Sequence, residues 1–95
     1  MTLQFHPAAQ DEFVETVDYY EAAGAGLGHQ FLAAVRACLD RILAHPEIGV
    51  RRRATRRLVV DGFPYDVVYR VQPDAIEVLA LAHHRRRPGY WRRRV

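Results

Sequence analysis

The stretch from Arg56 to Arg87 most constrains the fold, because it contains three apolar runs separated by turn residues. The runs are Leu58–Val60, Tyr65–Val71 and Ala75–Ala82, and they are rich in the residue types that favour strands. Asp-Gly in the first break and Gln-Pro-Asp in the second are turn signals. Short turns between successive strands require antiparallel pairing. The sequence therefore predicts a three-stranded meander, with strands near 57–60, 65–71 and 75–82.

The residue pattern inside these runs indicates how the meander is buried. In the second run Tyr65, Val67, Tyr69 and Val71 share one face of the strand. The third run is apolar on both faces as far as Leu81, which is typical of a central strand. The third strand therefore needs a cover on both faces of the sheet.

Residues 83–95 offer little material for the second cover, because most of them are His and Arg. We expect this C-terminal segment to be too short for a sizeable element and too basic to be buried. We therefore expect Leu79, Leu81 or leucines on the helix faces to stay partly exposed in the isolated chain.

Two amphipathic segments precede the meander and predict helices at about 7–23 and 27–44. Pro7 suits the first turn of the first helix, and His45-Pro46 ends the second. The Gly-rich link at residues 24–28 predicts a helical hairpin. The apolar residues expected between the helices and the sheet are Phe13, Val17, Phe31, Val35 and Ile42. Outside these elements, Leu3–Phe5 is a candidate edge strand and residues 47–55 are predicted to form a loop.

The length of 95 residues predicts a single domain, spanning residues 1–95. Cys38 is the only cysteine, so no internal disulfide can form, and its place in the apolar stripe of the second helix predicts a packed thiol. The N-terminal residues do not resemble a signal peptide, and no apolar run is long enough to cross a bilayer. These features together predict a cytoplasmic protein.

The charge is distributed unevenly along the chain. Residues 1–50 carry seven acids and two arginines, whereas residues 51–95 carry twelve arginines and four acids. Arginines stand at both ends of the meander, in Arg56-Arg57 and in Arg85-Arg86-Arg87. This asymmetry predicts an acidic or polyanionic partner for the second half of the chain.

The order of the segments and two specific motifs resemble the RelE/ParE superfamily of toxins from bacterial type II toxin–antitoxin systems. The motifs are GFPYDVVY at residues 62–69 and AHHRRRPGYW at residues 82–91. The resemblance implies an α+β fold of order βααβββ, in which an antiparallel helical hairpin packs on a small, mainly antiparallel sheet. It also implies a cognate antitoxin as partner, in a toxin–antitoxin hetero-oligomer, and no cofactor.

The superfamily acts on two kinds of target. Its RelE-like members cleave messenger RNA on the ribosome without a metal, and its ParE-like members inhibit DNA gyrase. The GFPY motif and the arginine-rich ending are more similar to the ParE-like and plasmid-stabilisation members. Inhibition of gyrase is therefore the favoured expectation, and ribosome-dependent RNA cleavage is the alternative.

Four residues lie in places broadly similar to those of the RelE-like active residues, namely Arg57, His83, Arg86 and Tyr90. Metal-free RNA cleavage needs a general base, a general acid and cations that stabilise the charged transition state. His83 or Tyr90 could exchange the proton, and Arg57 with Arg86 could stabilise the charge. His83 equally suits a structural role at a strand end. Adjacent His83 and His84 point opposite ways along a strand, which does not suggest a zinc site.

The predicted strands do not place these four candidates together. Arg57 begins the first strand of the meander and His83 ends the third, so the two lie at opposite ends of the sheet unless the strands are short. We therefore expect the functional surface within residues 83–91, with Arg85 as a further member, rather than at Arg57.

Overall fold

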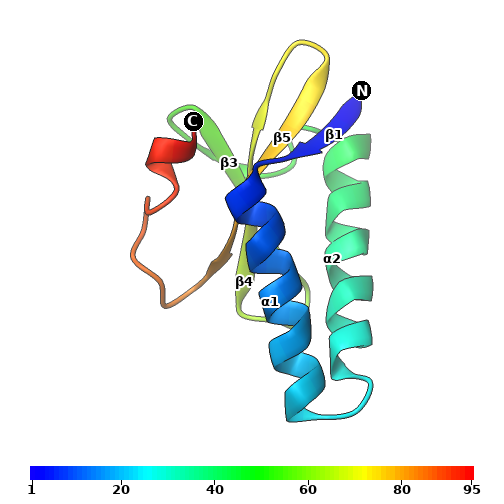
Figure 1. The fold of residues 1–95 in the computed structure, drawn as a ribbon. Coiled ribbons are helices and arrows are strands. Elements are labelled where there is room, and N and C mark those ends of the chain that lie inside the picture. Colours follow the sequence, from blue (N-terminus) through cyan, green and yellow to red (C-terminus); the bar gives the residue numbers. More distant parts are fainter.

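The computed structural model describes residues 1–95, and its five strands form one sheet of order β1-β5-β4-β3-β2. β1 pairs with β5 in parallel, and the other neighbours are antiparallel. Helices α1 and α2 lie side by side over one face of this sheet, and the C-terminal segment lies on the other side (Figure 1). The predicted α+β class with a helical hairpin on a mainly antiparallel sheet is confirmed. The elements are β1 (Thr2–Phe5), α1 (Pro7–Ala23), α2 (Leu27–Ala44), β2 (Val50–Arg52), β3 (Thr55–Val59), β4 (Tyr65–Val71), β5 (Ala75–His83) and a short 3-10 helix, η1 (Arg92–Arg94).

Strand β2 differs from expectation, because residues 47–55 are predicted to form a loop. β2 pairs with β3 through Val50 opposite Arg57 and Arg52 opposite Thr55, so only Arg53 and Ala54 form the turn. Arg53 adopts a left-handed backbone with φ of 56°, which is uncommon for any residue except glycine. The run of arginines lacks the alternation that marks a strand, and this is why the sequence pattern misses β2.

The two helices are joined by contacts that only a few residue types allow. Glu21 of α1 accepts hydrogen bonds from the backbone N–H groups of Gly26 and Gly28, both at 3.0 Å, and so caps the N-terminus of α2. A Cβ atom at position 28 would lie 2.8 Å from the carbonyl oxygen of Val17. Glycine at this position therefore lets the two helices approach closely at the hairpin.

The core between the helices and the sheet is built largely as the apolar stripes predict. Phe31, Val35 and Ile42 are buried on α2, and they pack against buried residues of β4 and β5. Phe13 and Val17 are only half-buried, which corrects the expectation that they are fully enclosed. Phe13 packs edge-on against Phe5, with the ring centroids 5.5 Å apart. Since β1 is an edge strand, little of the sheet lies beyond it to cover Phe13.

A β-bulge in β5 determines which apolar side chains of this strand lie on each face of the sheet. Val68 of β4 pairs with Ala80, and Tyr69 pairs with Val78, so Leu79 has no partner on β4. As a result Val78 and Leu81 join the cluster under the helices, whereas Leu79 and Ala80 join the cluster on the opposite face. The bulge thus supplies two neighbouring apolar side chains to that face.

The C-terminal segment covers this second face, which the basic composition does not predict. Trp91 is only 5% exposed and packs with Val68, Leu79, Ala80 and Ala82. Leu79 and Leu81 are buried, so the expectation that they are exposed is wrong. Leu79 is covered because Tyr90 and Trp91 turn inward while most of the neighbouring arginines stay exposed, and Leu81 is covered by the helices. We call residues 84–95 the tail from here on.

Leucines on the outer face of α2 remain accessible, as predicted. Leu32 is 41% exposed and Leu43 is 36% exposed. Together with Val14 and Tyr19 of α1, they are the large apolar side chains that remain exposed on the helices. No helix of the chain is both long enough and apolar enough to cross a membrane.

Cys38 provides a pH-dependent test of the core. Its thiol is 2% exposed, and burial raises its pKa to about 11, with Arg41 opposing that shift. The pKa of an unfolded thiol is about 8.5. The pKa of the thiol is higher in the folded chain than in the unfolded chain. The stability that the protonated thiol contributes is therefore fully present below the unfolded pKa, and it is lost as pH rises through the folded pKa. We expect the free energy of unfolding to fall between about pH 8.5 and 11, by at most about 3 kcal/mol.

Urea unfolding at a series of alkaline pH values measures this effect, and Cys38→Ser is the control. The variant removes the titrating thiol, so its loss of stability over the same pH range should be smaller. Equal slopes for the parent and the variant would contradict the assignment to Cys38. A native thiol that reacts with a disulfide reagent at pH 8 as fast as the unfolded chain would also contradict it.

Candidate functional site

The four candidate residues do not form one cluster, because three of them lie at the end of β5 and in the tail and the fourth lies on β3. His83 and Arg86 line a shallow cavity of about 150 Å³ beside α1, together with Tyr65 and Leu81. Arg57 lies in the middle of β3, opposite Val68, and lines a different cavity. The structure therefore brings His83 and Arg86 together and separates them from Arg57.

His83 is held at the end of β5 by contacts within the chain. Its ring packs edge-on against Tyr65, with the centroids 4.9 Å apart. Its Nδ1 accepts a hydrogen bond of 3.0 Å from the backbone N–H of Arg85, which leaves Nε2 as the atom able to donate a proton. His84 points the other way, and its Nε2 lies 3.0 Å from a carboxylate oxygen of Asp66.

Tyr90 is half-buried, and its hydroxyl already has a partner. The hydroxyl donates to the carbonyl oxygen of Leu81 at 3.2 Å, and the guanidinium of Arg86 stacks 3.7 Å from the ring centroid. Burial and the neighbouring Glu12 carboxylate raise the pKa of Tyr90 well above its usual range. A phenol that holds its proton so firmly is poorly suited to exchange it during catalysis.

Glu12 of α1 is the centre of the contacts that hold the tail. Its carboxylate accepts two hydrogen bonds from the guanidinium of Arg94, at 2.9 and 3.1 Å, and one from the backbone N–H of Leu81 at 3.1 Å. Arg86 lies 3.5 Å from the same carboxylate. The Glu12 and Arg94 side chains are only 13% and 16% exposed, so little solvent screens this pair.

Arg94 also bonds to the bulge in β5. One of its nitrogen atoms donates to the carbonyl oxygen of Leu79 at 2.9 Å, and its guanidinium lies 5.1 Å from the Tyr90 ring centroid. The hydrogen bond to Glu12 raises the pKa of Arg94, so this cation stays charged. A single arginine therefore joins the tail to both α1 and the central strand.

The cavity that contains His83 and Arg86 is electrostatically mixed. Glu12 and Glu15 line it as well, and Glu12 already pairs with Arg86. Two carboxylates beside the cations repel a phosphodiester and reduce the positive potential available to it. This cavity is therefore a poor place for the charged transition state of RNA cleavage.

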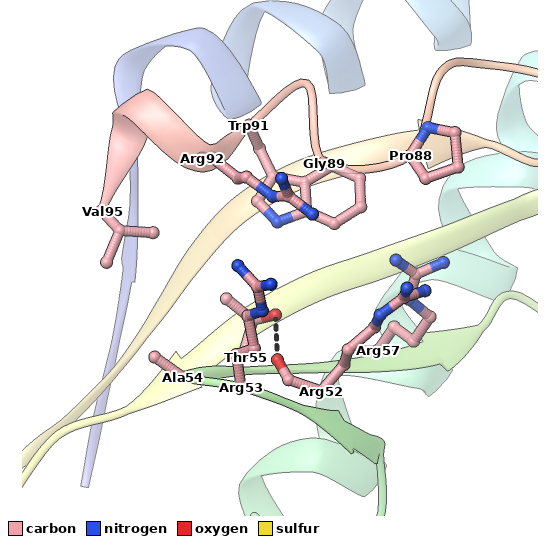
Figure 2. Close-up of a pocket in the computed structure, with 10 residues that line it drawn as sticks. All are labelled: Arg52, Arg53, Ala54, Thr55, Arg57, Pro88, Gly89, Trp91, Arg92 and Val95. Atoms are coloured by element: carbon pink, nitrogen blue, oxygen red, sulfur yellow. Dashed lines mark hydrogen bonds between the residues drawn. The ribbon is translucent and has the colours of Figure 1, made fainter.

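A second cavity, also of about 150 Å³, lies between the β2–β3 hairpin and the tail. Four arginine side chains line it, and Trp91 forms its inner wall. Figure 2 shows the guanidinium of Arg53 rising from the hairpin towards Arg92 and Trp91 on the tail. We call this cavity the arginine pocket, and the residues that define it here are Arg52, Arg53, Arg57, Arg92, Trp91 and Gly89.

Arg57 and Arg92 are placed in this pocket by specific neighbours. The Arg57 guanidinium lies 5.1 Å from the centroid of the Trp91 ring and 3.7 Å from a carboxylate oxygen of Asp66. Arg92 lies against Gly89, where a Cβ atom would come within 2.6 Å of its Nε. Gly89 also has a φ of 80°, which disfavours other residues.

Sequence reasoning missed the residues that matter most to these contacts. Glu12 resembles an ordinary acid in the first turns of a helix, and Arg94 resembles one more cation in a basic run. Neither has a local signal, because they lie 82 residues apart in the sequence. The run Arg51-Arg52-Arg53 signals charge, but its place beside Trp91 depends on β2 and on the folded tail.

No group of three or more His, Cys, Asp or Glu side chains lies close enough together to hold a metal ion. Arginine guanidinium groups are the main polar side chains of the arginine pocket, and no carboxylate lines it, which suits an anion.

The chain is similar to known proteins in both its fold and its sequence. Among solved structures, the fold is similar to that of the chromosomal ParDE toxin–antitoxin system from P. aeruginosa, with a TM-score of 0.63 and 18% identity over 87% of this chain and 95% of that one. At this identity the likeness concerns the fold. No curated protein matches the sequence. The family of the ParE toxin of type II toxin–antitoxin system, parDE, matches residues 3–88. Because that match spans both helices and all five strands, the chain belongs to the ParE toxin family.

Proposed function

We propose that the free protein arrests growth by inhibiting DNA gyrase through direct contact, and that a cognate antitoxin neutralises it. The family match over residues 3–88 carries this proposal. The contacting surface is the tail with its exposed arginines Arg85, Arg86 and Arg87, beside the end of β5.

The geometry favours contact over catalysis. Cleavage of RNA needs an acid and a base placed on either side of a phosphodiester, with cations beside it. Here the Tyr90 hydroxyl is bonded to Leu81, and Arg86 is paired with Glu12. Arg57 lines a different cavity from His83. These contacts support inhibition by binding, in which exposed charge and shape matter more than proton transfer.

Two assays on separate targets distinguish the proposal from the alternative, which is ribosome-dependent cleavage of messenger RNA. In a gyrase supercoiling assay the purified protein should inhibit the enzyme. When messenger RNA ends are mapped after induction of the protein in cells without antitoxin, no new ends should appear. New ends with unaffected gyrase would support the alternative and overturn the proposal.

Matched variants test the same point at the level of single groups. His83→Gln and Tyr90→Phe remove proton-exchanging groups and keep the side-chain shape, so growth arrest should persist. The double variant Arg85→Ser and Arg87→Ser removes exposed charge and should weaken the arrest. Neither Arg85 nor Arg87 forms an ion pair in the chain, so their loss should not affect folding. Circular dichroism melting of each variant checks the fold.

The proposed antitoxin contact lies on the helical side. Leu32 and Leu43 of α2 are accessible and give an apolar surface that a disordered antitoxin segment can cover as it folds. Coexpression with the neighbouring reading frame should yield a complex that copurifies. If the two products do not associate, this assignment of the partner is wrong, whatever the outcome with gyrase.

A further inference from the structure

We propose that the arginine pocket between the β2–β3 hairpin and the tail is a binding site for a phosphate group. The pocket is formed by Arg52 and Arg53 from the hairpin, Arg57 from β3, and Arg92 from the tail. This inference does not depend on gyrase inhibition, because it concerns a ligand that the isolated chain can bind.

Most of the charge of the pocket is not balanced by acidic side chains of the chain. The chain has six ion pairs, and none of them involves Arg52, Arg53 or Arg92. Arg57 has an acidic neighbour, Asp66, at a loose 3.7 Å. No acidic side chain lines the pocket. Four like charges around one small volume repel one another, and a bound anion relieves that repulsion.

The arrangement of donors suits a phosphate better than a carboxylate. A carboxylate has two oxygens in one plane, and a single bidentate guanidinium can occupy both. Guanidinium groups that approach from the hairpin on one side and the tail on the other need acceptors in several directions (Figure 2). The tetrahedral oxygens of a phosphate provide them.

The size of the pocket limits what can enter. Its volume is about 150 Å³. This is below the roughly 300–1,000 Å³ of pockets that enclose whole small molecules. Trp91 is 5% exposed and Arg57 lies over its ring, so no base can stack on the indole. The pocket therefore takes the phosphate itself, while the rest of the ligand stays outside.

The backbone is shaped to present these cations. Arg53 is the only residue other than glycine with a positive φ, and it occupies the turn that carries its guanidinium to the pocket. Gly89 adopts a φ of 80° and leaves the space in which Arg92 lies. A left-handed backbone at a residue other than glycine, as at Arg53, is a strained conformation that is found most often at binding sites.

The single tryptophan of the chain makes the proposal directly measurable. Trp91 lines the pocket, so its fluorescence reports an anion that binds there. The probes are inorganic phosphate, pyrophosphate, a short single-stranded oligonucleotide and a hexaglutamate peptide, each titrated into the purified chain at constant ionic strength. We expect a saturable change with phosphate-containing probes and no such change with chloride. Binding should also raise the melting temperature.

The relative affinities of the probes distinguish the possible sources of the phosphate. Pyrophosphate that binds as tightly as the oligonucleotide supports a site for free phosphates. An oligonucleotide that binds more tightly, with an affinity that falls steeply as salt increases, supports a site for nucleic acid backbone. Hexaglutamate that binds more tightly than every phosphate probe would make this an acidic-peptide site and overturn the proposal, as would the absence of saturable binding.

Two variants of equal charge change complete the test. Arg53→Gly removes a pocket cation at a backbone conformation that glycine prefers, so it should fold well and weaken binding by about tenfold. Arg36→Ser removes an exposed cation from α2, outside the pocket, and should change the affinity less than about twofold. Equal losses in the two variants would show non-specific charge attraction and overturn the pocket assignment.

Discussion

Phe31→Ala should lower the free energy of unfolding by about 3–5 kcal/mol, which is the usual cost of truncating a large core aromatic. Phe31 is 0% exposed. Its ring lies 5.1 Å from that of Tyr20, 5.0 Å from Phe63 and 5.6 Å from Tyr65. Truncation removes the ring that α1, the β3–β4 turn and β4 all contact. Urea unfolding followed by circular dichroism measures the change.

Leu32→Ala is the matched control for this variant. Leu32 is the next residue on α2 but is 41% exposed, so its truncation should cost less than about 1 kcal/mol. The comparison separates loss of packing from any effect on helix propensity, since both changes introduce alanine in the same turn. If the two variants unfold alike, the orientation of α2 on the sheet is wrong.

Glu12→Ala should destabilise the protein by about 3 kcal/mol, because it leaves a partly buried guanidinium without its partner. The change also removes the acceptor that the backbone N–H of Leu81 uses. Glu12→Gln keeps an oxygen for that N–H but loses the charge, so it should cost less, about 2 kcal/mol. Trp91 belongs to the tail that Glu12 holds. In the Glu12→Ala protein, the Trp91 emission should therefore shift to longer wavelength at a lower urea concentration than the one at which the circular dichroism signal changes.

Glu15→Ala provides the control on the same helix. Glu15 is exposed and forms no ion pair, so its removal should change the stability by less than about 0.5 kcal/mol. A Glu12→Ala protein that unfolds like the parent, with unchanged Trp91 emission, would show that the tail is held by apolar packing alone.

Local patterns in the sequence were sufficient to predict both helices and the three long strands. The Asp61-Gly62 turn, the proline at the start of α1 and the spacing of Phe31, Val35 and Ile42 are signals that neighbouring residues carry by themselves. The motifs GFPYDVVY and AHHRRRPGYW then led to the correct family.

The features that the sequence did not predict depend on contacts between distant segments. β2 exists because it pairs with β3, not because Arg51 and Arg52 favour a strand. Trp91 is buried because the tail folds back over a bulge in β5. The candidate residues line two different cavities for the same reason. The tail brings Trp91 to Arg57, whereas His83 lies beside α1.

The hydrogen bonds of the tail have a consequence for how molecules of this protein meet one another. β1 ends at Phe5 and pairs with β5 only as far as Val78, so the rest of that strand edge has no neighbouring strand. There the backbone groups of Leu81 bond to Glu12 and Tyr90, and the carbonyl of Leu79 bonds to Arg94. Because side chains already occupy these groups, a strand from a second molecule cannot pair with this part of β5. The tail and Glu12 thus protect this part of the sheet from edge-to-edge pairing, and the open edges of the sheet are those of β1 and β2.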